Sequence, residues 1–155
     1  MIVRRRVARA LALLAAWPVL ARAHAGHEET AWGKPGDPKR AARVVPIVMQ
    51  EREGRMVFIP DSVRVRTGEQ IRFVPRNAGV LDHEFVLATT EENRRHAIEM
   101  EQHPHMDHDE PNAKRLKPRG TGEILWHFTK PGRFEFACLI PGHLAAGMVG
   151  TVTVE

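Results

Sequence analysis

The sequence predicts an all-β domain, a sandwich or a barrel, with a short helix and a loop inserted between two of its strands. Eight segments of four to eight residues are rich in β-branched and aromatic residues, and several alternate apolar with polar side chains, as Ile71-Arg72-Phe73 does. Turn signals such as Thr67-Gly68 and Pro131-Gly132 separate these segments. Many short strands at regular spacing are typical of sandwiches and barrels.

The expected strands occupy residues 44–50, 56–59, 63–66, 70–75, 83–89, 122–129, 133–138 and 148–154. After the fifth strand, Thr89 and Glu92 have the spacing of a capping box, which predicts a helix over residues 91–102. The helix should end before Pro104, and the loop that follows is rich in His and Met. We interpret the whole stretch from this helix to Arg119 as an insertion between two strands.

The first 23 residues have the features of a signal peptide. Four arginines lie within the first nine residues, and the apolar run from Val7 to Leu20 is too short to span a bilayer. Ala21-Arg22-Ala23 supplies the small-x-small pattern that a signal peptidase reads, and cleavage after Ala25 fits the same rule. We therefore expect an exported, periplasmic protein with no membrane insertion after cleavage. An uncleaved membrane anchor is the alternative.

The formal charge of +4 and the high pI come from this N-terminal segment. Five of the 23 lysines and arginines lie in the first 23 residues, whereas all 19 acidic residues follow them. The remaining 18 basic and 19 acidic groups give the rest of the chain a formal charge of about −1. The charge therefore gives no support for a nucleic-acid partner, and we expect none.

Residues 24–43 contain His, Gly, Pro and charged residues without apolar periodicity. This composition predicts a mobile, His-containing N-terminal arm. We interpret residues 44–155 as the single folded domain, which is long enough to form a core of its own.

Cys138 is the single cysteine, and it lies in the segment with the strongest chemical signal. Exported proteins usually pair their cysteines, so a lone one is either an inert buried thiol or a functional group. Cys138, His143 and Met148 form the pattern Cys-x4-His-x4-Met. Soft sulfurs hold Cu(I), imidazole nitrogens hold Cu(II), and a His2Cys set with a weak axial Met suits both. The pattern predicts a copper site that takes a second imidazole from elsewhere.

His83 is the best candidate for that second imidazole. Side chains two apart in a strand share a face, so His83 lies in line with Phe85 on the apolar side of its strand. The same rule places Cys138 and Met148 on the apolar side of their strands. His127 falls opposite to its apolar neighbours, which argues against it as a ligand. A Cys–His hydrolase would leave Met148 and the Pro-Gly turn unexplained.

Residues from about 44 to 155 resemble a cupredoxin, the plastocyanin and azurin type of small blue copper protein. The resemblance is carried by Cys-x-x-Pro-Gly-His at residues 138–143, followed by Gly-Met-x-Gly at residues 147–150. It implies a Greek-key β-sandwich and one type-1 copper that transfers single electrons. It also implies four ligands, which are His83, Cys138, His143 and Met148. Many members have Asn or Ser after the first His ligand, whereas this chain has Glu84, which bears on the hydrogen bonds near the thiolate.

Within the family, the His-rich N-terminus and the His/Met insertion look most like periplasmic cupredoxins associated with copper tolerance. This likeness implies a role in copper handling. A dedicated electron carrier between respiratory redox partners is the alternative, favoured by small apolar residues around His143 that a redox partner could contact. We expect a monomer without catalysis of its own. Multicopper oxidases commonly have histidines on both sides of the cysteine, where this chain has Ala137 and Leu139.

A second, weaker copper site is one interpretation of the remaining His and Met residues, and a solvated polar loop is the other. The residues concerned are Met100, His103, His105, Met106 and His108 in the insertion. His24 and His27 raise the same question in the arm. Cleavage after Ala23 would expose an α-amine that could chelate Cu(II) together with the His24 ring.

Overall fold

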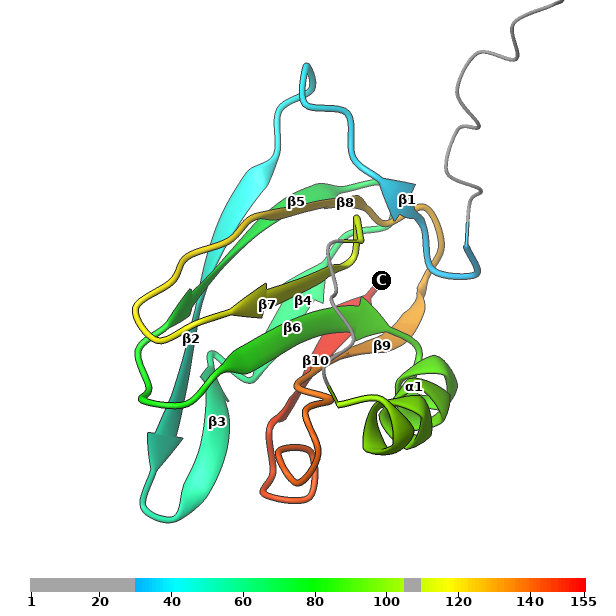
Figure 1. Cartoon of the computed structure of the whole chain (residues 1–155). Coiled ribbons are helices and arrows are strands. Elements are labelled where there is room, and N and C mark those ends of the chain that lie inside the picture. The colour runs from blue at the N-terminus through cyan, green and yellow to red at the C-terminus, as the bar shows by residue number, and fades with distance from the viewer. Residues whose placement is uncertain (1–29, 105–109) are drawn as a thin grey trace, which may run out of the picture.

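Two five-stranded sheets face each other in the computed structural model, which describes residues 30–104 and 110–155 (Figure 1). The first sheet has the order β1-β8-β5-β2-β3 and the second the order β4-β10-β9-β6-β7. The strands of the first sheet are β1 (Lys34–Pro35), β2 (Arg43–Arg52), β3 (Arg55–Ile59), β5 (Gln70–Asn77) and β8 (Ile124–His127). Those of the second are β4 (Ser62–Val65), β6 (His83–Ala88), β7 (Ala113–Leu116), β9 (Gly132–Ala137) and β10 (Val149–Val154). The predicted all-β sandwich is confirmed.

The chain passes repeatedly from one sheet to the other, so neighbouring strands are often distant in sequence. β2 pairs with β5 in parallel, and β4 pairs with β10 in parallel, while the remaining pairs are antiparallel. All eight expected strands are present, with ends that differ by a few residues. β1 and β7 were not expected. The Ala-Lys-Arg-Leu sequence of β7 has no β-branched or aromatic residue, and pairing with β6 makes it a strand despite its weak propensity.

The N-terminal arm differs from the prediction from Thr30 onward. Trp32 is only 2% exposed, and its ring stacks on Trp126 with a centroid distance of 4.1 Å. β1 then pairs with β8, and a Cβ on Gly33 would lie 2.2 Å from the carbonyl oxygen of His127. The expectation of mobility is therefore wrong for residues 30–35, because the buried Trp32 and the pairing of β1 with β8 attach the segment to the sandwich. Residues 24–29 and the predicted signal peptide lie outside the described residues.

The main core lies between the two sheets and is largely aromatic. Phe85 of β6 stacks on Phe136 of β9 with a centroid distance of 5.1 Å and an interplanar angle of 12°. Phe58 from the opposite sheet meets both rings edge-on. Gly150 of β10 lies opposite Phe136 in the strand pairing and leaves room for its ring. These contacts fix β6 and β9 side by side.

The predicted helix is present as α1 (Thr90–Gln102), and its capping box is formed by Thr89 and Glu92. The helix packs on the outer side of β6 and β9, where Met100 is fully buried in a second apolar cluster with Val86 and Leu139. The expected insertion therefore consists of this helix, a loop and the edge strand β7. No helix among the described residues is long and apolar enough to span a membrane.

Replacement of Gly150 by alanine should destabilise the sandwich without touching a proposed ligand. The new Cβ would lie 2.2 Å from two carbons of the Phe136 ring, so the stack has to shift. We expect a loss of about 1–3 kcal/mol in the free energy of unfolding, measured by urea denaturation. The neighbouring Thr151→Ser variant should stay within about 0.5 kcal/mol of the wild type. An equally stable Gly150→Ala protein would contradict this description of the core.

Candidate metal centre

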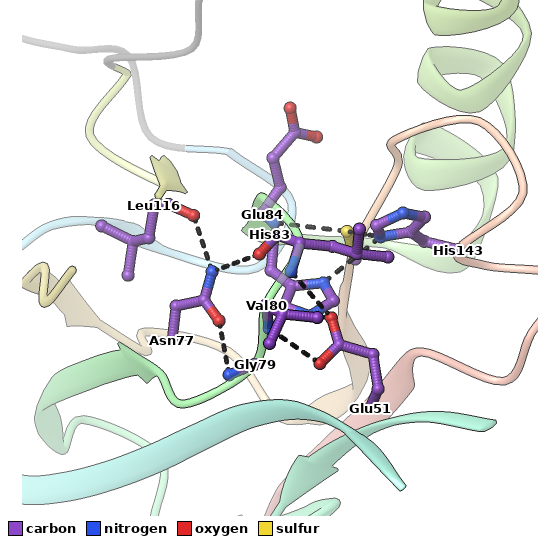
Figure 2. Close-up of polar contacts among 10 residues, drawn as sticks. Glu51, Asn77, Gly79, Val80, His83, Glu84, Leu116 and His143 are labelled. Carbon is purple, nitrogen blue, oxygen red and sulfur yellow. Dashed lines mark hydrogen bonds and ion pairs between the residues drawn. The ribbon is translucent and has the colours of Figure 1, made fainter. Parts of the chain in front are cut away.

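Three of the predicted ligands converge at one end of the sandwich. Nδ1 of His83 lies 3.3 Å from Nδ1 of His143, which in turn lies 3.3 Å from Sγ of Cys138 (Figure 2). The possible ligand atoms of the three residues all lie within 4.8 Å of one another. His83 and Cys138 have no exposed surface, and His143 is 8% exposed. Among the described residues, this is the one such group of His, Cys, Asp or Glu.

Strand pairing brings His83 and Cys138 together although they are far apart in sequence, since Cys138 lies 54 positions after Glu84, the neighbour of His83. β6 and β9 are antiparallel, with Val86 opposite Ala137, so the first residues of β6 lie beside the residues that follow β9. The backbone N–H of Glu84 donates a hydrogen bond of 3.2 Å to Sγ of Cys138. Residue 84 therefore contacts the sulfur of Cys138 through its backbone and not through its side chain.

The loop between β9 and β10 folds back and places His143 over the sulfur. The N–H of His143 donates to the carbonyl of Ile140, which closes a turn over Pro141 and Gly142. Gly142 has a φ of +87°, a conformation that favours glycine, so the Pro-Gly pair meets the need of this turn.

Met148 closes the same loop. Its N–H donates to the carbonyl of His143, and its carbonyl accepts from the N–H of Cys138. The Met148 side chain is fully buried in the main core. Its backbone is thus tied to two of the converging residues, while its role as the axial ligand stays a prediction.

Burial keeps the donor atoms neutral in the metal-free protein. It raises the pKa of the Cys138 thiol to about 12 and lowers the pKa values of His83 and His143. Neutral imidazoles are the form that binds metal, whereas the thiol has to lose its proton when an ion binds. Two imidazoles and one thiolate, shielded from water and close enough to share one ion, fit the trigonal His2Cys set of a copper centre.

Glu51 is a member of the site that the sequence did not indicate. Its Oε1 lies 3.1 Å from Nε2 of His83, whereas Nδ1 of the same ring faces His143. Burial opposes ionisation of Glu51, but hydrogen bonds from the backbone, including those of Val80 and Leu81, lower its pKa overall. Glu51 comes from β2, and no motif in the sequence links that strand to His83.

Glu84 faces away from the proposed metal position although it follows His83. Its carboxylate is fully buried, and its oxygens have no hydrogen-bond partner within the part of the chain that the structure describes. The guanidinium of Arg115 lies 3.6 Å away, and burial raises the pKa of Glu84 to about 7.

The other predicted metal-binding residues are not gathered at this site. Met100 belongs to the apolar cluster under α1, and His103 is exposed at the C-terminal end of that helix. His24, His27, His105, Met106 and His108 lie outside the described residues, so a second copper site stays a prediction. The Nε2 of His127 lies 3.1 Å from the carbonyl oxygen of Gly68, in a contact outside the three converging residues.

Comparison with known proteins agrees with copper as the metal of this candidate site. Residues 45–155 match the profile of the copper-binding proteins of the plastocyanin/azurin family. The chain belongs to this family. The resemblance inferred from the Cys-x-x-Pro-Gly-His motif is thereby confirmed.

Within the family, the chain is similar to proteins named copper-resistant cuproprotein CopI. It is 51% identical to the protein from Rubrivivax gelatinosus over 135 residues, which are 87% of this chain and 80% of the relative. It is 37% identical to the protein from Pseudomonas aeruginosa, with 81% of this chain and 83% of the relative covered.

Solved structures with the same fold include an auracyanin from Roseiflexus castenholzii, at 23% identity and a TM-score of 0.60, covering 75% of this chain and 99% of that one. An azurin from Methylomonas sp. strain J gives a TM-score of 0.58 at 13% identity, with 74% and 99% covered. At these identities the likeness establishes the cupredoxin fold.

Copper binding at this site should stabilise the fold, because the ion binds donors that are assembled only in the folded chain. At a free copper concentration 100 times the dissociation constant, we expect a gain of about 2.7 kcal/mol in the free energy of unfolding. The His83→Gln variant should lose most of this gain, whereas His127→Gln should keep it. Calorimetry with and without copper measures the copper-induced gain in stability of each variant. A His83→Gln protein with the full copper-induced gain would contradict the assignment of His83.

Proposed function

We propose that this protein is a periplasmic type-1 copper protein that binds one copper ion and serves in copper tolerance. The proposed ligands are His83, Cys138, His143 and Met148. The single observation that carries the proposal is the convergence of two imidazole nitrogens and the lone thiol in a buried position. Bound copper supplies a one-electron Cu(I)/Cu(II) couple.

The chain itself contributes a fixed, dry set of donors to this couple. The hydrogen bonds at both ends of the 138–148 loop and the strand pairing of β6 with β9 hold the ligand positions. The aromatic core beside them limits rearrangement when the charge of the ion changes. A protein that holds its ligands in one geometry suits both oxidation states, because little reorganisation accompanies electron transfer.

A role in copper tolerance is supported by the two relatives described above, both of which are named copper-resistant cuproproteins. The signal-like first 23 residues support export to the periplasm, where such a protein would meet incoming copper. We also propose that the protein is a monomer without catalysis of its own, membrane insertion or nucleic-acid binding. The buried Ala137 and Leu139 beside Cys138 offer no further ligand for an oxidase-type copper cluster.

A dedicated electron carrier is the second candidate. It is favoured by exposed apolar side chains at the metal end, including Val80, which is 81% exposed, and Leu81, which is 44% exposed. Pro141 and Ala145 are also exposed in the loop that carries His143. Such a surface is easily desolvated, so a redox partner protein could dock near His143 and make the small, weak contact typical of electron transfer.

The visible and EPR spectra of the Cu(II)-loaded mature protein test the copper site. We expect an intense thiolate-to-copper band, because Cys138 is the single thiol of the chain and lies within reach of both imidazoles. The band should be absent in the Cys138→Ser variant, which keeps the size of the side chain and removes the sulfur. A wild-type protein without the band at full copper loading would refute the proposal.

Copper stoichiometry separates the two candidate roles. Copper handling with a second weak site predicts more than one bound copper per chain. The excess should disappear when His103, His105 and His108 are all replaced by alanine, while the thiolate-to-copper band stays. A carrier predicts one copper per chain and fast electron exchange with a cytochrome. Normal copper tolerance in a strain that lacks the gene would count against the handling role.

A further inference from the structure

Glu51 contacts the ring of His83, the first histidine of the proposed copper site. Its Oε1 lies 3.1 Å from Nε2 of His83 and accepts a hydrogen bond of 3.0 Å from the N–H of Leu81. Its Oε2 accepts another of 3.0 Å from the N–H of Val80. Figure 2 shows the carboxylate between the imidazole and the loop that precedes it. One side chain of β2 thus binds both a ligand ring and the backbone that leads into β6.

Asn77 holds the other side of the same loop. This fully buried amide donates to the carbonyl oxygens of Leu81, at 2.7 Å, and Leu116, at 2.9 Å, and accepts from the N–H of Gly79 at 2.9 Å. The loop between β5 and β6 is therefore fastened on two sides directly before His83. A Cβ on Gly79 would lie 2.3 Å from Oε2 of Glu51, so the carboxylate occupies the space that glycine leaves open.

The chemistry of this contact bears on the metal. An ionised carboxylate only accepts hydrogen bonds, so Nε2 of His83 has to carry the ring proton. Nδ1 then keeps its lone pair, and Nδ1 is the nitrogen that faces His143. A carboxylate partner also makes an imidazole a stronger donor, which favours Cu(II) over Cu(I).

We propose that Glu51 is a positioning residue of the copper centre, which fixes the Nδ1-ligating tautomer of His83 and lowers the reduction potential of the bound copper. This inference rests on the proposed function. It assigns to Glu51 an electronic effect on the metal in addition to its hold on the loop.

The test compares copper-loaded, full-length mature protein with Glu51→Gln, Glu51→Ala and Glu53→Gln variants. Glu53→Gln removes the same charge two residues away, from a side chain that is 83% exposed and pairs with Arg52. Loss of a hydrogen-bonding partner of a metal-bound histidine typically weakens metal affinity about 10- to 100-fold. If the affinity for Cu(II) alone weakens about tenfold, the reduction potential of the bound copper rises by about 59 mV.

We expect the potential to increase in the order wild type, Glu51→Gln, Glu51→Ala, with Glu53→Gln close to the wild type. Glutamine keeps an acceptor oxygen without the charge, so it should retain the tautomer of His83, which ¹⁵N NMR of the copper-free protein reports directly. Glu51→Ala should lose the single tautomer. If Glu51→Ala fails to fold, Glu51→Gln alone decides the potential.

A purely structural role would lower the melting temperature of the Glu51 variants and leave their reduction potential equal to that of Glu53→Gln. That result would overturn the inference, while an intact thiolate-to-copper band would leave the proposed function standing. A wild-type protein without that band would refute the proposed function, and the inference with it. The two failures are therefore told apart by the wild-type spectrum.

Discussion

The pairing of β6 with β9 is the interaction on which the metal centre depends. Its register sets Phe85 against Phe136 in the core and, at the end of the same two strands, His83 beside Cys138. Side chains alternate between the faces of a strand, so a slip of one residue would turn the imidazole outward and the next residue inward. The large stacked rings oppose such a slip, because burying them elsewhere would leave a cavity in the core. Packing of the core and assembly of the site are therefore set by one register.

Burial of the donors has two opposite effects on this site. It makes the thiolate costly in the metal-free protein, as the raised pKa of Cys138 reflects. It also excludes water, which strengthens the interaction of the thiolate with an ion once one is bound. The free protein can thus hold a neutral thiol among neutral imidazoles in an apolar environment. The fold tolerates the copper-free state without an unpaired buried charge on its ligands.

The sequence was sufficient for eight of the ten described strands and for the three proposed ligands that converge, because these leave local signals. Alternation marked the apolar face at Phe85 and Phe136, and the Pro-Gly turn placed His143 near Cys138. β7 and the Trp32 segment were missed because they depend on partners distant in sequence. A lone tryptophan in a Gly- and Pro-rich stretch has no periodicity, and its burial against Trp126 appears only after β8 is in place. Glu51 was missed for the same reason, since its partners lie about 30 residues away in another sheet and a loop.

The structure also explains how the chain can carry a glutamate directly after His83, its first proposed ligand. The hydrogen bond to Sγ of Cys138 comes from the backbone N–H of residue 84, which any residue except proline supplies. The side chain points to the opposite face of the sheet, where Arg115 lies near it. A charge there acts on the sulfur through space, and its effect is partly offset by the guanidinium. Two carboxylates thus flank His83 with different consequences. Glu51 contacts the ring of the proposed ligand His83 directly, whereas Glu84 contacts the sulfur only through its backbone N–H, a contact that does not depend on which side chain residue 84 carries.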